Sequence, residues 1–229
     1  MSKEKNASGL FKPVDLTQGT CWKTILRFAF PVIISCLFQQ IYTISDAAVV
    51  GQTLTDAMVA GVNDSSPLVF IFLQFAFGIT AGFSVITSAA AGKGDKEYLR
   101  KAFAEQIVLC FIVTIVLTSL SVVLVKPLLA TVNVTPENAE IYDAASTYCV
   151  VIFAGIGAQL FYNYICSFLR GLGDSVTPLL FLVFSTLLNV GLDILFIVAF
   201  KWGVFGAAIA TVIAQFLSAV LSFVYAFVK

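Results

Sequence analysis

The sequence predicts an all-α membrane protein with six transmembrane helices, on the evidence of composition, segment length and charge distribution. The chain has 229 residues, of which 59% are hydrophobic and 11% charged, and its mean hydropathy is +0.98. Soluble domains carry about 25% charged residues, so these values argue against a water-soluble fold. Apolar segments can be drawn at about 25–50, 66–91, 102–129, 144–168, 176–200 and 204–228.

Each segment is long enough to cross a hydrocarbon core of about 30 Å as a helix, some with tilt. The first segment contains Pro31, and a charged connector at 92–101 joins the second to the third. The fourth follows a polar stretch, and the fifth opens at Pro178, where proline suits the start of a helix. The sixth begins with the small residues of 206–210, which favour close helix packing. The segments contain many Phe and β-branched residues, but at this length they indicate membrane helices rather than strands.

The basic residues are distributed unevenly between the two sides of the predicted bundle. Eleven of the thirteen Lys and Arg residues precede the first segment, follow the sixth, or lie between the second and third or the fourth and fifth. Only Lys126 and Lys201 fall on the other side. The positive-inside rule therefore places both ends of this segment of chain in the cytoplasm, with the helices in the plasma membrane.

Residues 1–23 are polar and mixed in charge, so we expect a cytoplasmic N-terminal segment followed by a six-helix transmembrane lobe over 24–229. The first apolar run is too long for the core of a signal peptide and lacks a small-residue cleavage pattern. It is expected to remain as the first membrane helix.

Several functional classes are disfavoured by composition. The net charge is zero, whereas a nucleic-acid-binding surface calls for a basic face. The chain has no histidine, and its five cysteines are scattered without a CxxC spacing, so zinc, haem attachment and a disulfide framework are poorly supported. We expect no resident cofactor and no enzymatic activity.

Two acids inside apolar segments are the strongest functional signal. Asp193 lies in a run with no other charge between Asp174 and Lys201, and a carboxylate at membrane depth is costly. Asn189 precedes it by one helical turn, as Tyr42 precedes Asp46 in the first segment, so each pair shares a helix face. If the two acids approach each other, both cannot stay ionised cheaply, and one takes up a proton or both bind a cation. We predict that Asp46 and Asp193 are the working groups of a transporter.

Further polar side chains fall at membrane depth. They are Gln39, Gln74, Gln159, Asn163 and Gln215. Gln39 is seven residues from Asp46 and shares its face, while Thr211 and Gln215 are four apart on another helix. These groups could line a substrate path, but membrane amides also commonly join helices by hydrogen bonds. Both interpretations stay open at this point.

The residues of four motifs, within 31–51, 170–178, 188–193 and 206–211, together resemble the multidrug and toxic compound extrusion (MATE) transporters, including their DinF-like and NorM-like branches. The first segment resembles that family's first helix at Pro31, Gln39, Tyr42, Asp46 and Gly51. The motif Arg170-Gly171-x-Gly173-Asp174-x-x-x-Pro178 is similar to the family's fourth loop. Similar matches to the fifth and sixth helices are Leu188-Asn189-x-x-x-Asp193 and Gly206-Ala207-Ala208-x-Ala210-Thr211. Order and spacing hold from about Thr24 to Val228.

The resemblance implies a fold of twelve helices in two six-helix lobes, of which this chain would be the N-terminal lobe. It also implies export of cationic or amphipathic drugs in exchange for Na⁺ or protons. The implied ion-coupling residues are Asp46, Asn189, Asp193 and Thr211, with Tyr42 and Gln39 in support. Sodium would bind at Asp193, Asn189 and Thr211, and Pro31 matches a proline associated with bending of the first helix.

The sequence stops after the sixth segment, which leaves two arrangements open. A C-terminal lobe follows in the same longer chain, or a second half-size chain completes the transporter. The alternative function is a flippase for lipid-linked oligosaccharides from the same superfamily, which would be expected to carry basic residues in its cavity. The membrane charges here are acidic. A membrane enzyme would need denser His, Ser–Lys or acidic motifs and a channel a filter-like loop, and neither pattern is present.

Overall fold

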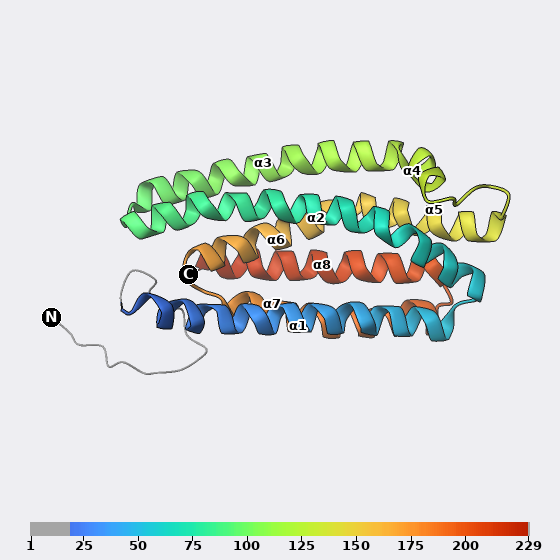
Figure 1. The fold of residues 1–229 in the computed structure, drawn as a ribbon, viewed down its shortest axis with the longest axis horizontal. Coiled ribbons are helices and arrows are strands. Elements are labelled where there is room, and N and C mark those ends of the chain that lie inside the picture. The colour runs from blue at the N-terminus through green and yellow to red at the C-terminus, as the bar shows by residue number, and fades with distance from the viewer. Residues whose placement is uncertain (1–18, 229) are drawn as a thin grey trace.

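A computed structural model describes residues 19–228 as a bundle of long helices, without a strand in that range (Figure 1). The elements are α1 (Cys21–Thr53), α2 (Asp56–Lys93), α3 (Lys96–Val123), α4 (Val125–Thr131), α5 (Ala139–Ala154), α6 (Ile156–Gly171), α7 (Val176–Asp193), the π-helix η1 (Ile194–Ala199) and α8 (Gly203–Val228). The predicted all-α membrane architecture is confirmed. Residues 1–18 of the predicted N-terminal segment lie outside the described residues.

Six spans result when one bent pair of helices is counted as a single crossing. Helices α1, α2, α3 and α8 are each long and apolar enough to cross a membrane, and α7 with η1 forms one span over Val176–Ala199. Helices α5 and α6 make up the remaining span and are bent by 47° at the break around Gly155.

Some helices extend beyond the apolar segments. α2 begins at Asp56, ten residues before the expected start. The apolar segment missed these first turns because they carry exposed polar residues such as Asn63 and Asp64. The expected connector at 92–101 is a tight turn, in which Gly94 takes φ 70° and the Asp95 side chain accepts a hydrogen bond from the Tyr98 backbone N–H at 2.9 Å. The other charged residues of the connector lie at the end of α2 and at the start of α3.

Helix α8 packs against helices on both of its sides in the bundle. α2 packs on α5 and α6, α6 packs on α8, and α7 packs on both α1 and α8. In Figure 1, α2 and α3 lie on one side of α8 and α1 lies on the other. The first half of α8 presents the buried alanines Ala207, Ala208, Ala210 and Ala214, which allow the close approach of neighbouring helices.

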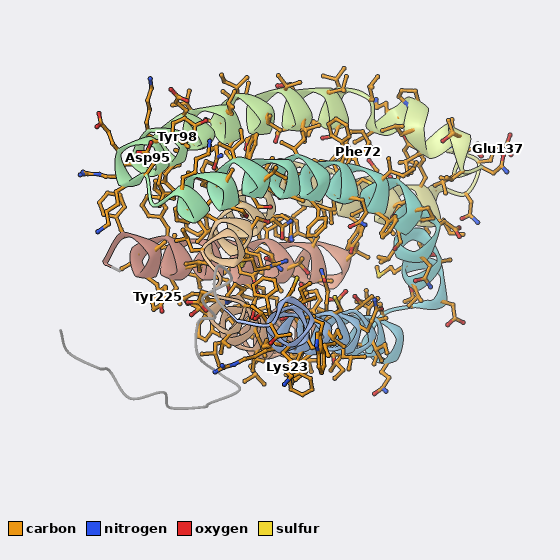
Figure 2. All side chains as sticks on the ribbon, turned by 60° about the vertical axis from the view of Figure 1, so that its left-hand side comes forward. Lys23, Phe72, Asp95, Tyr98, Glu137 and Tyr225 are labelled. Carbon is orange, nitrogen blue, oxygen red and sulfur yellow. The ribbon has the colours of Figure 1, made fainter. Side chains whose placement is uncertain are left out.

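The two ends of the bundle differ in charge. Figure 2 shows Asp95, Tyr98 and Tyr225 toward one end and Glu137 at the opposite end. The first end also contains the start of α1 and the α6–α7 turn, and the second contains the α1–α2 turn and the loop before α8 (Figure 1). Among the described residues, Lys and Arg at the first end are Lys23, Arg27, Lys93, Lys96, Arg100, Lys101 and Arg170, against Lys126 and Lys201 at the second.

Candidate ion-binding site

The structure brings Asp46 of α1 and Asp193 of α7 together. The two helices pack along their length, and their carboxyl groups lie close enough to interact directly with each other. Asp193 is fully buried and Asp46 is half-buried. Two acids that are far apart in the sequence therefore form one site inside the apolar bundle.

Three of the four carboxylate oxygens of this pair are buried without a hydrogen-bond donor. Oδ1 of Asp46 and both Oδ1 and Oδ2 of Asp193 are buried without a partner. An ion pair joins Lys101 to Glu105 on α3 and does not involve the acid pair. Because an ionised carboxylate only accepts hydrogen bonds, two such groups facing each other need a proton or a cation between them.

Polar groups of α7 and α8 surround the pair. Nδ2 of Asn189 donates a hydrogen bond to Oγ1 of Thr211 at 3.4 Å, while Oδ1 of Asn189 is buried without a donor. The hydroxyl of Tyr42 lies within reach of Thr211 and Gln215 but makes no hydrogen bond of normal geometry. Oε1 of Gln215 is also unpartnered. Unsatisfied oxygens therefore gather where the two carboxylates meet.

Helix geometry changes directly beside Asp193. This residue ends α7, and the next six residues continue as the π-helix η1, which closes with a hydrogen bond from the Phe200 N–H to the Leu195 carbonyl at 3.0 Å. π-helical turns are rare in proteins, and those that occur are often found at functional sites. The wider turn alters the helix immediately after the buried acid.

One member of the site has no signal in the sequence that sets it apart. Tyr148 of α5 lies within electrostatic range of Asp46, Tyr42 and Asp193. It is one of seven tyrosines and sits in an apolar segment without an acid one turn away. The packing of α5 against α2 and α8 brings its ring toward the acid pair.

The other candidate residues are placed in different ways. Pro31 is buried inside α1, which continues unbroken through it. Gln39 and Gln74 are exposed on the surfaces of α1 and α2. On α6, Nε2 of Gln159 donates to Oδ1 of Asn163 at 3.4 Å, so these two amides pair within their own helix. Of the amides considered as a substrate path, Gln215 lies beside the acid pair.

The oxygen set suits a small monovalent cation or a proton. Na⁺ prefers several oxygen ligands, and the site offers two carboxylates, the Asn189 carbonyl and the Thr211 hydroxyl. A proton placed between the carboxylates would supply the missing donor. Among the described residues, no three His, Cys, Asp or Glu side chains gather to hold a metal ion.

Comparison with known proteins places this chain in a family. The MatE family model matches residues 31–195. The probable multidrug resistance protein YpnP of Bacillus subtilis is 32% identical over 210 residues, which cover 89% of this chain and 45% of that protein. YoeA of the same organism, also described as a probable multidrug resistance protein, is 29% identical over 213 residues, which cover 91% of this chain and 45% of that protein.

A solved structure has the same fold as this chain. A MOP-superfamily transporter from Pyrococcus furiosus superposes with a TM-score of 0.84 at 28% identity, covering 95% of this chain and 47% of that one. The chain thus spans about half the length of the relatives that it matches. It corresponds to one lobe of such a protein, and the chain belongs to the MATE family of membrane transporters.

Proposed function

We propose that this chain is the N-terminal lobe of a secondary active multidrug exporter. In this proposal, cationic or amphipathic drugs leave the cell in exchange for inward-moving Na⁺ or protons, and Asp46 and Asp193 are the ion-coupling carboxylates. The observation that carries the proposal is the buried pair of acids, which interact with each other while three of their oxygens have no donor.

The energetic cost of this pair supports a functional role. A single carboxylate at the centre of a membrane helix costs roughly 2.5–3.5 kcal/mol on insertion scales. Two facing carboxylates repel each other as well. A bound proton or Na⁺ reduces the negative charge of the lobe, whereas its release leaves the carboxylates of Asp46 and Asp193 to repel each other. The pair therefore has two states of different charge.

Coupling follows if the two charge states favour different helix packing. α1 carries Asp46 and contains Pro31, which has no backbone N–H to complete the helical hydrogen-bond ladder. Neutralising the acid pair lets α1 repack against α7, with Pro31 as the weakest point of the helix. Drug and ion then exchange because each favours a different state of the lobe.

We further propose that the end with the α2–α3 turn faces the cytoplasm of a plasma membrane. The excess of Lys and Arg at that end, among the described residues, follows the positive-inside rule. The drug site would lie between this lobe and a second one, which is supplied by further sequence beyond Lys229 or by a second copy of the chain.

The test is ethidium efflux from cells or everted vesicles that contain the protein as the cell makes it, including any sequence beyond Lys229. A Na⁺ gradient and a proton gradient are imposed separately. We expect efflux to follow one gradient and to fall to background in Asp46→Asn and in Asp193→Asn.

Glu137→Gln is the matched control, because Glu137 is an exposed acid in the loop before α5. It should export at the parent rate. Full efflux in either membrane-acid variant, at equal amounts of protein in the membrane, would show that the acids are structural. No efflux by the parent under either gradient would instead favour the flippase.

A further inference from the structure

The acid pair lies much nearer to one end of the bundle than to the other. Asp193 is the last residue of α7 and lies 17 positions after Val176 at the first end, which is about 25 Å of helix. On the other side, only η1 separates it from the loop before α8. Asp46 is similarly placed, seven residues before the end of α1 and 25 after its start. An ion that crosses the lobe therefore has a long apolar distance to cover on one side.

Helices α7 and α8 run antiparallel along this distance, and their register is fixed at both ends. Asn189 contacts Thr211 beside the acids. At the first end, the hydroxyls of Thr177 and Tyr225 lie 3.3 Å apart, and the rings of Phe181 and Tyr225 are 5.8 Å apart. Every residue between these contacts can therefore be placed at a level along the pair of helices.

Polar residues fill that interval at spacings of one helical turn. We call them the α7–α8 seam, and they are Ser185 on α7 and Gln215, Ser218 and Ser222 on α8. Ser185 follows Asn189 by one turn toward the first end, and Gln215 follows Thr211 in the same direction. The register places Ser185 at the level between Gln215 and Ser218. All four seam residues are buried.

The hydroxyls of Ser185 and Ser218 have no hydrogen-bond partner, although neither residue has any exposed surface. Hydroxyls elsewhere in the bundle, on α2 as well as on α7, donate to a carbonyl of their own preceding turn. The neighbouring Thr186 does so to Leu182 at 2.8 Å, and Ser66 does so to Val62 at 2.7 Å. Ser185 and Ser218 depart from this pattern.

The seam continues to a group of polar side chains at the first end. The Ser222 hydroxyl donates to the carbonyl of Ser218 in the turn before it. One turn further, Tyr225 is partly exposed, and its hydroxyl lies beside that of Thr177. The Thr177 hydroxyl in turn donates to Oδ2 of Asp174 at 2.8 Å. Figure 2 shows Tyr225 toward the same end as Asp95 and Tyr98.

We propose that the α7–α8 seam is the route by which the coupling cation passes between the acid pair and the end of the bundle at Tyr225. The unpartnered oxygens of Gln215, Ser185 and Ser218 give Na⁺ successive ligands, or give a proton hydroxyls that both accept and donate. This role rests on the proposed function, since it requires that Asp46 and Asp193 bind the ion. The serines act on the rate of passage, and the acids determine the binding.

The experiment is cation exchange at equilibrium in proteoliposomes that contain the protein as the cell makes it. Radioactive Na⁺ reports sodium exchange, and a trapped pH-sensitive dye reports proton movement. We expect Ser185→Ala/Ser218→Ala to slow exchange of the coupling ion by about tenfold, equivalent to about 1.4 kcal/mol in the barrier. The half-saturating ion concentration should stay within about twofold, because the acid pair is intact.

Thr186→Val is the matched control, since its hydroxyl is satisfied within α7, and it should exchange at the parent rate. Asp193→Asn separates the two proposals. If Asp193→Asn stops exchange but the double serine variant exchanges at the parent rate, the proposed route along the seam is overturned and the proposed function stands. If exchange persists in Asp193→Asn, or the parent moves neither ion, both proposals fail. A raised half-saturating concentration at an unchanged maximal rate would also overturn the seam, because the serines would then belong to the binding site.

Discussion

Asn189 and Thr211 join α7 to α8 through a 3.4 Å hydrogen bond one turn from Asp193, with the Asn189 amide as donor. This leaves the Asn189 carbonyl without a donor, and it also leaves the lone pairs of the Thr211 hydroxyl oxygen only partly used. The bond thus holds two neutral oxygens beside a carboxylate pair. Such a set distinguishes a sodium site, which uses neutral oxygens as ligands, from a proton site, which needs only the acids.

Thr211→Val tests this distinction, because valine keeps the shape of threonine and lacks the hydroxyl. If the proposed site binds Na⁺, we expect the half-saturating Na⁺ concentration for drug efflux to rise by about tenfold, which is about 1.4 kcal/mol. Thr211→Ser keeps the hydroxyl and should stay near the parent value. An unchanged Na⁺ dependence in Thr211→Val would show that this hydroxyl is not a ligand.

Gly61 marks the closest approach between α2 and α5. A Cβ atom at Gly61 would lie 2.6 Å from the Ile141 carbonyl oxygen and 2.8 Å from Cβ of Ala144. Both contacts involve groups fixed by the backbone, so the helices must separate. We expect Gly61→Ala to destabilise the protein by about 1–3 kcal/mol, measured as a lower midpoint of thermal unfolding in detergent.

Gly78 in the same helix is the control for Gly61. A Cβ atom there meets nothing within 4 Å. Replacing a helical glycine by alanine removes backbone freedom from the unfolded chain, so Gly78→Ala should stabilise the protein by about 0.5–1 kcal/mol. Equal midpoints for the two variants would contradict the packing of α2 on α5.

The fold was accessible from the sequence because the bilayer imposes a simple length rule. Long apolar runs had to be spanning helices, and the structure has them. The helix boundaries were harder, since α2 extends through polar residues that an apolar-run criterion leaves out. The break at Gly155 gave no signal either, because isolated glycines are tolerated inside membrane helices.

The acids of the site stood out because charge at membrane depth is costly, and Asn189 stood out because it is one turn from Asp193. Tyr148, Ser185 and Ser218 could not be found in the same way. Serine in a membrane helix normally bonds to its own backbone, so only the three-dimensional structure shows that Ser185 and Ser218 do not. The approach of Asp46 to Asp193 likewise depends on how α1 packs on α7.

Asp174 holds the start of α7 at the end of the seam. Its Oδ1 accepts a hydrogen bond from the Thr177 backbone N–H at 3.0 Å, and its Oδ2 accepts from the Thr177 hydroxyl at 2.8 Å. Asp174 is 2% exposed and Thr177 is half-buried, so loss of the carboxylate leaves partly buried donors unsatisfied. We expect Asp174→Ala to lower stability by about 1–2 kcal/mol. Asp174→Asn retains one acceptor oxygen and should lose less, and a larger loss for Asn than for Ala would contradict the capping role.

Gly155, at the bend between α5 and α6, lies in close contact with Val212 of α8. A Cβ atom at Gly155 would lie 2.6 Å from Cγ1 of Val212 and 3.0 Å from its Cβ. Val212 directly follows Thr211, so a displaced α8 would also move the oxygen beside the acid pair. We therefore expect Gly155→Ala to lower the unfolding midpoint, with a cost of about 1–3 kcal/mol, and to weaken ion coupling in efflux assays.

A second substitution shows whether that cost arises from the clash with Val212. Val212→Ala removes both γ carbons, so Gly155→Ala/Val212→Ala should recover much of the lost stability, with a coupling of about 0.5–3 kcal/mol between the sites. Gly82→Ala, where a Cβ meets nothing within 4 Å, controls for the general effect of alanine in a membrane helix. Additive losses in the double variant would mean that Gly155→Ala acts through the local helix and not through α8. Recovery of both stability and ion coupling would show that the α5–α6 bend sets the position of Thr211 relative to Asp193.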